Sequence, residues 1–283
     1  MDRITKQLLE DFSKAQEILD KKDDVIFEKF CNYTIITNEY NKTFDIETIT
    51  IGGGNDTGID GIAIIANGHL IENNDEIDDL IKANGYLDVT YIFIQAKTSS
   101  NFDTKEMHSF YFGVNDFFAE EHNLPRNSDI QKYSEISEHI LNNASSFKEN
   151  PKCKTFFITT GVFNKENEHI QALTKSSEET LTSCNLFELI KHNILGASEI
   201  GKLYRKTNSP VSSTFIFSNK ITLPEIEGIE QAYYGVLPYS EFKCELRADS
   251  QMTPTKESSS ESSKNMNHKS CIRTNSASRL NTR

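Results

Sequence analysis

The sequence lacks the features that would place the chain in a membrane or in an oxidising compartment. Its 283 residues contain no run of about 18 apolar residues, the length that a membrane-spanning helix needs. The N-terminus has polar residues throughout and lacks the apolar segment of a secretory signal peptide. The five cysteines are scattered, odd in number and without a CxxC pair, which argues against a disulfide framework or a structural zinc site. We therefore expect a cytoplasmic protein without membrane contact.

Positive charge is also scarce. The chain has 30 Lys and Arg against 42 Asp and Glu, and its formal net charge of -12 argues against a broadly basic surface that coats nucleic acid. The charge is uneven along the chain. Residues 247–283 hold seven basic and three acidic residues, a net +4, and the preceding body holds 23 and 39, a net -16. Any nucleic-acid site in the acidic body must therefore be local.

The hydrophobic pattern predicts an α/β fold with a mixed central sheet flanked by helices. Helices are predicted over 3–21, 23–37, 102–121, 127–147 and 164–181, and a solvated loop or short helix over 72–85. Strands are predicted over 42–51, 58–71 with a tight turn at Asn67-Gly68, 87–100, 152–161 and 213–223, with a short strand running into a helix over 181–193 and a strand followed by a turn over 230–242. We expect one domain over 1–246 and a disordered, Ser/Thr/Lys-rich tail over 247–283.

A glycine-rich loop, "GGGNDTG" at residues 52–58, separates two β-branched runs. It fails as a dinucleotide fingerprint because Thr57 holds the third glycine position and a strand follows. It fails as a P-loop because Ile59 stands where lysine is required. A sharp hairpin or bulge explains the glycines but not Asp60, which precedes an apolar strand. Taken alone, Asp60 could also be a turn-forming residue.

A second polar pair ends the buried strand at 87–100, where Gln95 and Lys97 lie two residues apart and so face the same side. Such groups are costly on an apolar strand unless they are paired. A carboxylate on the neighbouring strand would pair with Lys97, and so would a metal ion and a phosphate. Asp60, Gln95 and Lys97 therefore fit a metal-dependent phosphodiesterase, in which oxygen ligands hold Mg²⁺ and the lysine orients water. The alternative is a structural ion pair with an amide hydrogen bond.

The words "GGGNDTGIDGI" and "FIQAK", in this order and strand context, resemble the PD-(D/E)XK nuclease superfamily, in particular its Mrr-like restriction endonucleases with a QxK strand. The resemblance covers a core of about residues 25–160. It implies a restriction endonuclease-like fold that cuts DNA with Mg²⁺ or Mn²⁺. Asp60 would be a metal ligand, Gln95 would stand where Glu or Asp is usual, and Lys97 would be the catalytic lysine. It also implies a metal-proximal Glu on the first helix, for which Glu28 is the best candidate and Glu47 a weaker one.

The whole chain also resembles the N-terminal part of bacterial abortive-infection phage-resistance (AIPR) proteins. "GIEQAYYGVLPYSEF", from residue 228, resembles the junction where their second domain begins. The resemblance implies an antiphage DNA endonuclease whose C-terminal partner domain is replaced here by the tail, and we expect a truncated or frame-shifted product. A homodimer would supply two active sites for two strands. The alternative function is a catalytically inactive module of the same fold that binds nucleic acid or protein.

Several further side chains are candidates by their place in the sequence alone. Asp56 is interpreted as a loop-shaping residue. Tyr111 could face a substrate, although most aromatic residues occupy core positions. His108 and His122 are interpreted as surface or satisfied residues. Four lysines could contact phosphate by their proximity to the site, although each is more often a solvated surface lysine: Lys105, Lys132, Lys152 and Lys154.

Overall fold

The computed structural model describes residues 1–164, 166–208, 219–224 and 233–236, and the chain divides into two units, residues 1–208 and 209–283. Among the described residues, no helix is long and apolar enough to cross a bilayer. Three predictions lie outside the described residues: the domain end at 246, the second-domain start near 228 and the disordered tail at 247–283.

A five-stranded mixed sheet forms the centre of the first unit, in the order β2-β1-β3-β4-β5. β1 (Gly61–Ala66) pairs antiparallel with β2 (His69–Leu70) and with β3 (Val89–Lys97). β3, β4 (Lys152–Thr159) and β5 (Leu189–Leu195) are parallel to one another. The prediction of an α/β fold with a mixed central sheet is confirmed, and so is the tight turn, because Asn67 and Gly68 both have positive φ between β1 and β2.

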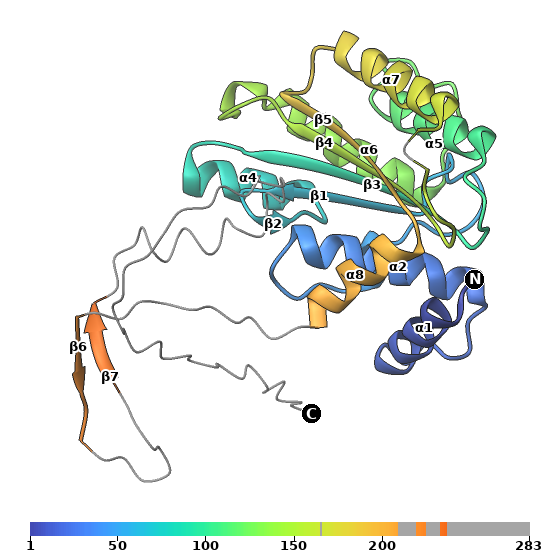
Figure 1. The fold of residues 1–283 in the computed structure, drawn as a ribbon. Helices are drawn as coiled ribbons and strands as arrows, with labels where there is room; N and C mark the ends of the chain where they lie inside the picture. Colours follow the sequence, from blue (N-terminus) through green and yellow to red (C-terminus); the bar gives the residue numbers. More distant parts are fainter. Residues whose placement is uncertain (165, 209–218, 225–232, 237–283) are drawn as a thin grey trace, which may run out of the picture. The chain divides into compact units, whose positions relative to one another are not determined.

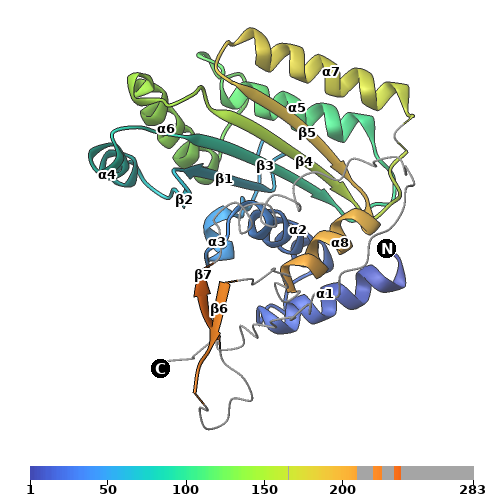
Figure 2. The ribbon, with the colours of Figure 1, turned by 60° about the vertical axis from the view of Figure 1, so that its left-hand side comes forward.

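Helices cover both faces of this sheet (Figures 1 and 2). α5 (Thr104–Phe117), α6 (Ser128–Asn142) and α7 (Glu168–Ser183) lie on one face. α1 (Arg3–Ala15), α2 (Asp23–Glu39) and α8 (Ala197–Asn208) lie on the other. β3 serves both cores because its side chains alternate: Tyr91 and Phe93 pack in the core with α5 and α6, whereas Ile92 and Ile94 pack in the core with α2.

Asparagine and aspartate side chains determine where several helices begin. Each accepts a hydrogen bond from a backbone N–H of the first turn, which satisfies a donor that the helix itself leaves unpaired. These residues are Asp2 before α1, Asp45 before α3 (Ile46–Ile49), Asn73 before α4 (Asn74–Asn84), Asp103 before α5, Asn127 before α6 and Asn167 before α7.

Four predictions of secondary structure were wrong or incomplete. The alternating segment 42–51 is not a strand, because Asp45 caps the short helix α3 there. The first helix ends at Ala15 and not at residue 21, since Glu17 adopts a left-handed conformation. The segment 181–193 has the reverse order, the end of α7 followed by β5. α8 was not predicted, although Ile200, buried on its inner face, belongs to a helical pattern.

The second unit contains one described hairpin, in which β6 (Asn219–Thr222) pairs antiparallel with β7 (Tyr233–Val236). The strands predicted in 213–223 and 230–242 are confirmed over these residues. The other residues of the two segments lie outside the described part of the chain, apart from Leu223 after β6.

Candidate functional site

The glycine loop delivers Asp60 to the edge of the sheet. Its backbone turns through left-handed conformations at Gly53, Asn55, Thr57 and Gly58, which explains the need for glycine and asparagine. Asp56 shapes the loop as predicted, because its carboxylate accepts a hydrogen bond of 2.8 Å from the N–H of Gly58.

The loop is also fastened from outside. The side-chain amide of Asn127, the N-cap of α6, donates to the carbonyl of Gly52 at 2.9 Å and to that of Gly54 at 3.4 Å. The N–H of Asn127 donates in turn to the carbonyl of Asn55 at 3.0 Å. One helix start therefore holds the loop that positions Asp60.

Asp60 lies beside the last residues of β3. It is 6% exposed, and its Oδ2 accepts a hydrogen bond of 2.8 Å from the N–H of Ala96. The same oxygen lies 3.8 Å from the ammonium of Lys97. No described residue donates a hydrogen bond to the other carboxylate oxygen, Oδ1. The predicted ion pair between Asp60 and Lys97 is confirmed, and one oxygen of the carboxylate remains available.

Asn32 of α2 is a supporting residue that sequence reasoning missed. Its side-chain amide is fully buried and donates to the carbonyl of Asp60 at 2.8 Å. A Cβ at Gly61, the next residue, would overlap this amide. Glycine is therefore needed at 61 so that α2 can approach β1 and hold Asp60. The available signal was the asparagine within the apolar run "FCNYTII".

Gln95 and Lys97 lie as the two-residue spacing predicts. β3 places them on one side, and the Lys97 side chain is 28% exposed, so that its ammonium reaches solvent. Gln95 is buried, and its Oε1 has no hydrogen-bond partner among the described residues. A buried carbonyl oxygen without a donor costs free energy, about 1–3 kcal/mol. Such an oxygen is a ready ligand for a hard cation.

Glu28 of α2 faces the same cluster and is half-buried. Burial and, second to it, the charge of Asp60 raise the pKa of Glu28 to about 7, against the opposing effect of Lys97. Burial likewise raises the pKa of Asp60 to about 6, against the opposing effects of Lys97 and of the hydrogen bond from Ala96. One lysine is therefore the positive charge near two carboxylates, which repel each other and are largely shielded from water.

Other predicted residues lie outside this cluster. Glu47, the weaker candidate, pairs with Lys29 instead. Lys152 aligns with Thr90 at the opposite end of β3, so its predicted proximity to the site was wrong. Tyr111 is 3% exposed and does not face a substrate.

Two further lysines and two histidines also lie outside the cluster. Lys154 pairs with Glu39 at 2.6 Å, and the ammonium of Lys132 lies over the ring of Tyr133. Neither contact joins the cluster around Asp60. His122 bonds Arg126 at 2.8 Å and His108 is exposed, which confirms the interpretation of both as surface or satisfied residues.

The donor set of the cluster fits a hard divalent cation. Two carboxylates, Asp60 and Glu28, and the unpaired amide oxygen of Gln95 are all oxygen ligands of the kind that Mg²⁺ accepts. In the described part of the chain, no group of three or more His, Cys, Asp or Glu side chains is placed to hold a metal. The candidate site therefore depends on Gln95 for its third protein oxygen.

The chain was compared with protein-family models, with curated proteins and with solved structures, and none of them matches it. The resemblance to PD-(D/E)XK nucleases and to AIPR proteins therefore stays a prediction from the short sequence words. The case for a function rests on the geometry of Asp60, Gln95, Lys97 and Glu28.

Proposed function

We propose that this chain is a metal-dependent phosphodiesterase with a restriction endonuclease-like fold, a DNA endonuclease of a bacterial antiphage system. The observation that carries the proposal is the charge imbalance at the end of β3. Asp60 and Glu28 share Lys97, and the Oε1 of Gln95 has no hydrogen-bond partner in the described part of the chain. A divalent cation would satisfy all three oxygen-bearing groups at once.

Asp60, Gln95 and Glu28 would hold Mg²⁺ or Mn²⁺. When bound, the ion would polarise the scissile phosphate and lower the pKa of a coordinated water. Asp60 is held for this role by Ala96 and Asn32, through hydrogen bonds of 2.8 Å each. The ammonium of Lys97 would orient the attacking water and offset the negative charge that develops on the phosphorus oxygens.

The direct test is cleavage of a supercoiled plasmid with Mg²⁺ or Mn²⁺. We expect the wild type to cut, and Asp60→Ala and Lys97→Ala to lose at least about a hundredfold in rate, since each removes an electrostatic contact to the reacting groups. Lys152→Ala is the matched control, because this lysine pairs with Asp88 at 3.2 Å at the opposite end of β3. Equal activity in all four proteins would sink the mechanism.

A non-catalytic binding module is the second candidate. The net charge of -16 on residues 1–246 favours it, as does the ion pair of Asp60 with Lys97, which can serve a structural role without a metal. Titration calorimetry separates the two. Absence of Mg²⁺ and Mn²⁺ affinity, together with a loss of stability in Lys97→Ala, would favour the binding module.

A further inference from the structure

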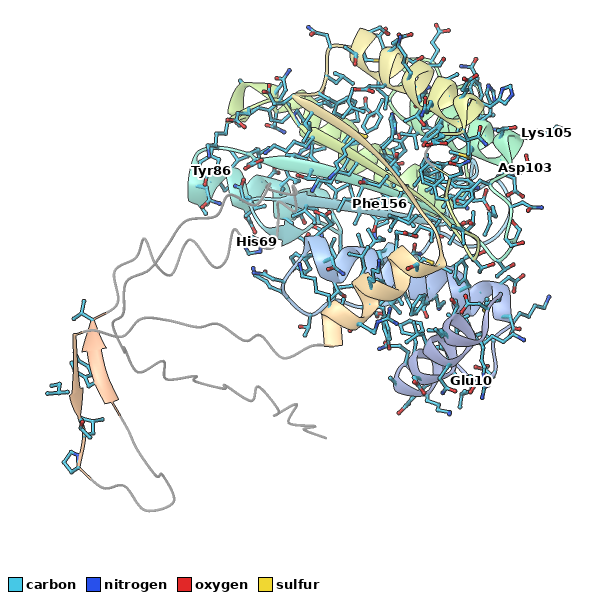
Figure 3. The ribbon with its side chains drawn as sticks, viewed as in Figure 1. Glu10, His69, Tyr86, Asp103, Lys105 and Phe156 are labelled. Carbon is cyan, nitrogen blue, oxygen red and sulfur yellow. The ribbon has the colours of Figure 1, made fainter. Side chains whose placement is uncertain are left out.

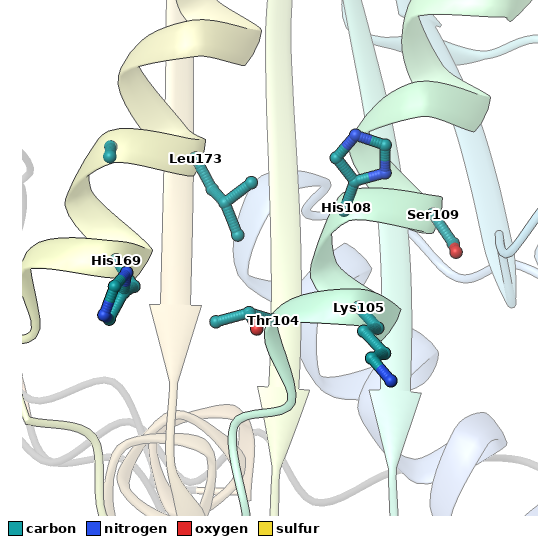
Figure 4. A pocket seen from close by; sticks show the side chains of 7 residues that line it. Thr104, Lys105, His108, Ser109, His169 and Leu173 are labelled. Carbon is teal, nitrogen blue, oxygen red and sulfur yellow. The ribbon is translucent and has the colours of Figure 1, made fainter.

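A surface groove runs between α5 and α7, with a volume of about 570 Å³. Figure 4 shows Thr104, Lys105, His108 and Ser109 of α5 on one side and His169 and Leu173 of α7 on the other. Both helices follow parallel strands, so they run side by side and begin at the same edge of the sheet, where β3 and β4 end. This is also the edge that holds Lys97.

The groove differs in charge from the acidic chain around it. Its lining includes one lysine, two histidines and the hydroxyls of Thr104 and Ser109, and no described lining residue is acidic. Lys105, His108 and His169 are all exposed. The carboxylate of Asp103, next to Lys105, keeps its charge but is directed to the backbone N–H of Lys105, which it caps. An anionic ligand is therefore the class that this lining complements.

An aromatic surface adjoins the groove. Phe112 lies one helical turn after His108 and is 44% exposed, unusual for a phenylalanine on a helix whose other large apolar residues are buried. The two rings are nearly parallel, 5° apart, and their centroids are separated by 6.4 Å. Flat rings beside a lysine fit single-stranded nucleic acid, which is bound through stacking and phosphate contacts.

The groove and the candidate site share one wall. Gly58, two residues before Asp60, lies beside α5: an added Cβ would be in ordinary van der Waals contact, 3.5 Å, with the backbone of Ser109 and of Phe110. The side-chain nitrogen of Gln95 is equally near the same position. Glu106, on the same turn of α5, is close enough for its charge to act on Asp60. The loop that carries Asp60 and the groove therefore both contact α5.

We infer that the groove between α5 and α7 binds an unpaired segment of the nucleic-acid strand next to the cleaved phosphate. Lys105 contacts a phosphate, and the rings of His108 and Phe112 stack on bases. This inference rests on the proposed function, because the same strand passes Lys97. It makes single-stranded or locally opened nucleic acid the substrate.

The test measures binding separately from cleavage. A fluorescein-labelled 15-nucleotide oligothymidine, a blunt duplex of the same length and free thymidine monophosphate are titrated with the full chain in EDTA. We expect the single strand to bind more tightly than the duplex, and the mononucleotide to compete weakly. Lys105→Ala should weaken strand binding about three- to tenfold and reduce the salt dependence by about one phosphate contact. Phe112→Ala should weaken it about fivefold or more.

Matched controls lie away from the groove: Tyr86, on the opposite side of Figure 3 from Lys105, and Lys82 of α4. Lys82→Ala removes an exposed lysine of α4, and Tyr86→Ala removes an exposed ring that, like Phe112, has one neighbouring partner, Lys148. Neither control should change binding by more than about twofold, the ordinary effect of a surface substitution away from a contact. All four substitutions are at exposed positions, and thermal unfolding verifies that each variant folds.

The outcomes separate this inference from the proposed function. Strand binding that depends on Lys105 and Phe112, without cleavage in any metal, would support the groove and refute the nuclease. Cleavage with wild-type strand binding in both variants would refute the groove and leave the nuclease standing. Tighter binding of the duplex, or mononucleotide competition at the affinity of the strand, would overturn the inference of an unpaired strand.

Discussion

A lysine lies beside carboxylates at both ends of β3, but the two groups differ in their exposure to water. At its beginning, Lys152 meets Asp88 at 3.2 Å, with both side chains partly exposed to water. At its end, Lys97 meets Asp60 at 3.8 Å. A second carboxylate, that of Glu28, is close enough for the charges of Asp60 and Lys97 to act on it. Lys152 also lies 4.0 Å from Glu149, so the lysine at each end faces two carboxylates. The first group is partly exposed to water, whereas Asp60 in the second is buried. Buried charge of this kind costs free energy unless it is paired, so the second arrangement stabilises the fold less than a fully paired one would.

The glycines near the two ends of β1 also differ in their surroundings. Replacing the one next to Asp60 should have the largest effect on stability that we expect. Gly61→Ala should lower the free energy of unfolding by about 2–4 kcal/mol, because its Cβ would displace the buried amide of Asn32. Gly68→Ala, at the other end of β1, meets open space and should cost only about 1 kcal/mol, from its positive φ. Urea unfolding measures both.

The double variant Asn32→Ala, Gly61→Ala provides the control for this overlap. It should be more stable than the sum of the two single effects implies, since the first substitution removes the atoms that the new Cβ would meet. Simple additivity would show that the cost of Gly61→Ala has another origin.

The pH dependence of stability should distinguish the two ends by about 2 kcal/mol. Asp60 has a raised pKa of about 6 in the folded state, so the fold favours its protonated form. Its contribution is present below the ordinary pKa of aspartate and is lost as pH rises through about 6. In EDTA, the wild type should lose about 2 kcal/mol of unfolding free energy between about pH 4.5 and pH 8. Glu28, half-buried and raised in the same direction, adds a smaller loss.

Asp60→Asn should reduce this loss to the smaller part that Glu28 contributes. Asp88→Asn, at the other end of β3, is the control. If Mg²⁺ at about pH 8 restores the lost stability to the wild type and not to Asp60→Asn, the missing positive charge is a metal ion. An unaltered profile in Asp60→Asn would show that the two ends of β3 do not differ in this way.

Gln95→Glu adds a third carboxylate to the end of β3 that already holds Asp60 and Glu28. With a third carboxylate, Mn²⁺ affinity at about pH 8 should rise about tenfold, since ligand charge tunes affinity for hard cations. Titration calorimetry gives the value. Gln131→Glu, an exposed change on α6, is the control. Unchanged affinity in Gln95→Glu would exclude position 95 as a ligand.

Much of the cluster was predictable because it depends on short-range geometry. The two-residue spacing of Gln95 and Lys97 fixes their common side, and the turn before β1 fixes the position of Asp60. Asn32 was not predictable in this way, because its bond to the carbonyl of Asp60 joins residues 28 apart and depends on how α2 packs. Lys152 was misplaced because the parallel register of β4, which sets it opposite Thr90, has no local signal.

The same reasoning explains the errors in the fold. The segment 42–51 alternates as a strand would, but Asp45 offers the backbone a competing hydrogen bond that begins α3. α8 is amphipathic, and its place on the α2 face depends on contacts with residues more than a hundred positions earlier. Local pattern therefore predicted most elements and their general order, while long-range contacts determined the exceptions.

The hydrogen bonds from Asn127 to the glycine loop affect the expected order of folding. The residues that they join are 73 and 75 positions apart, and Asp60 lies in the segment that they close. Contacts of such sequence separation form late, because the intervening chain must first lose its freedom. During synthesis from the N-terminus, β1 and β3 can pair before the loop is anchored. We therefore expect the cation site to mature only after α6 has docked, as one of the last steps in folding.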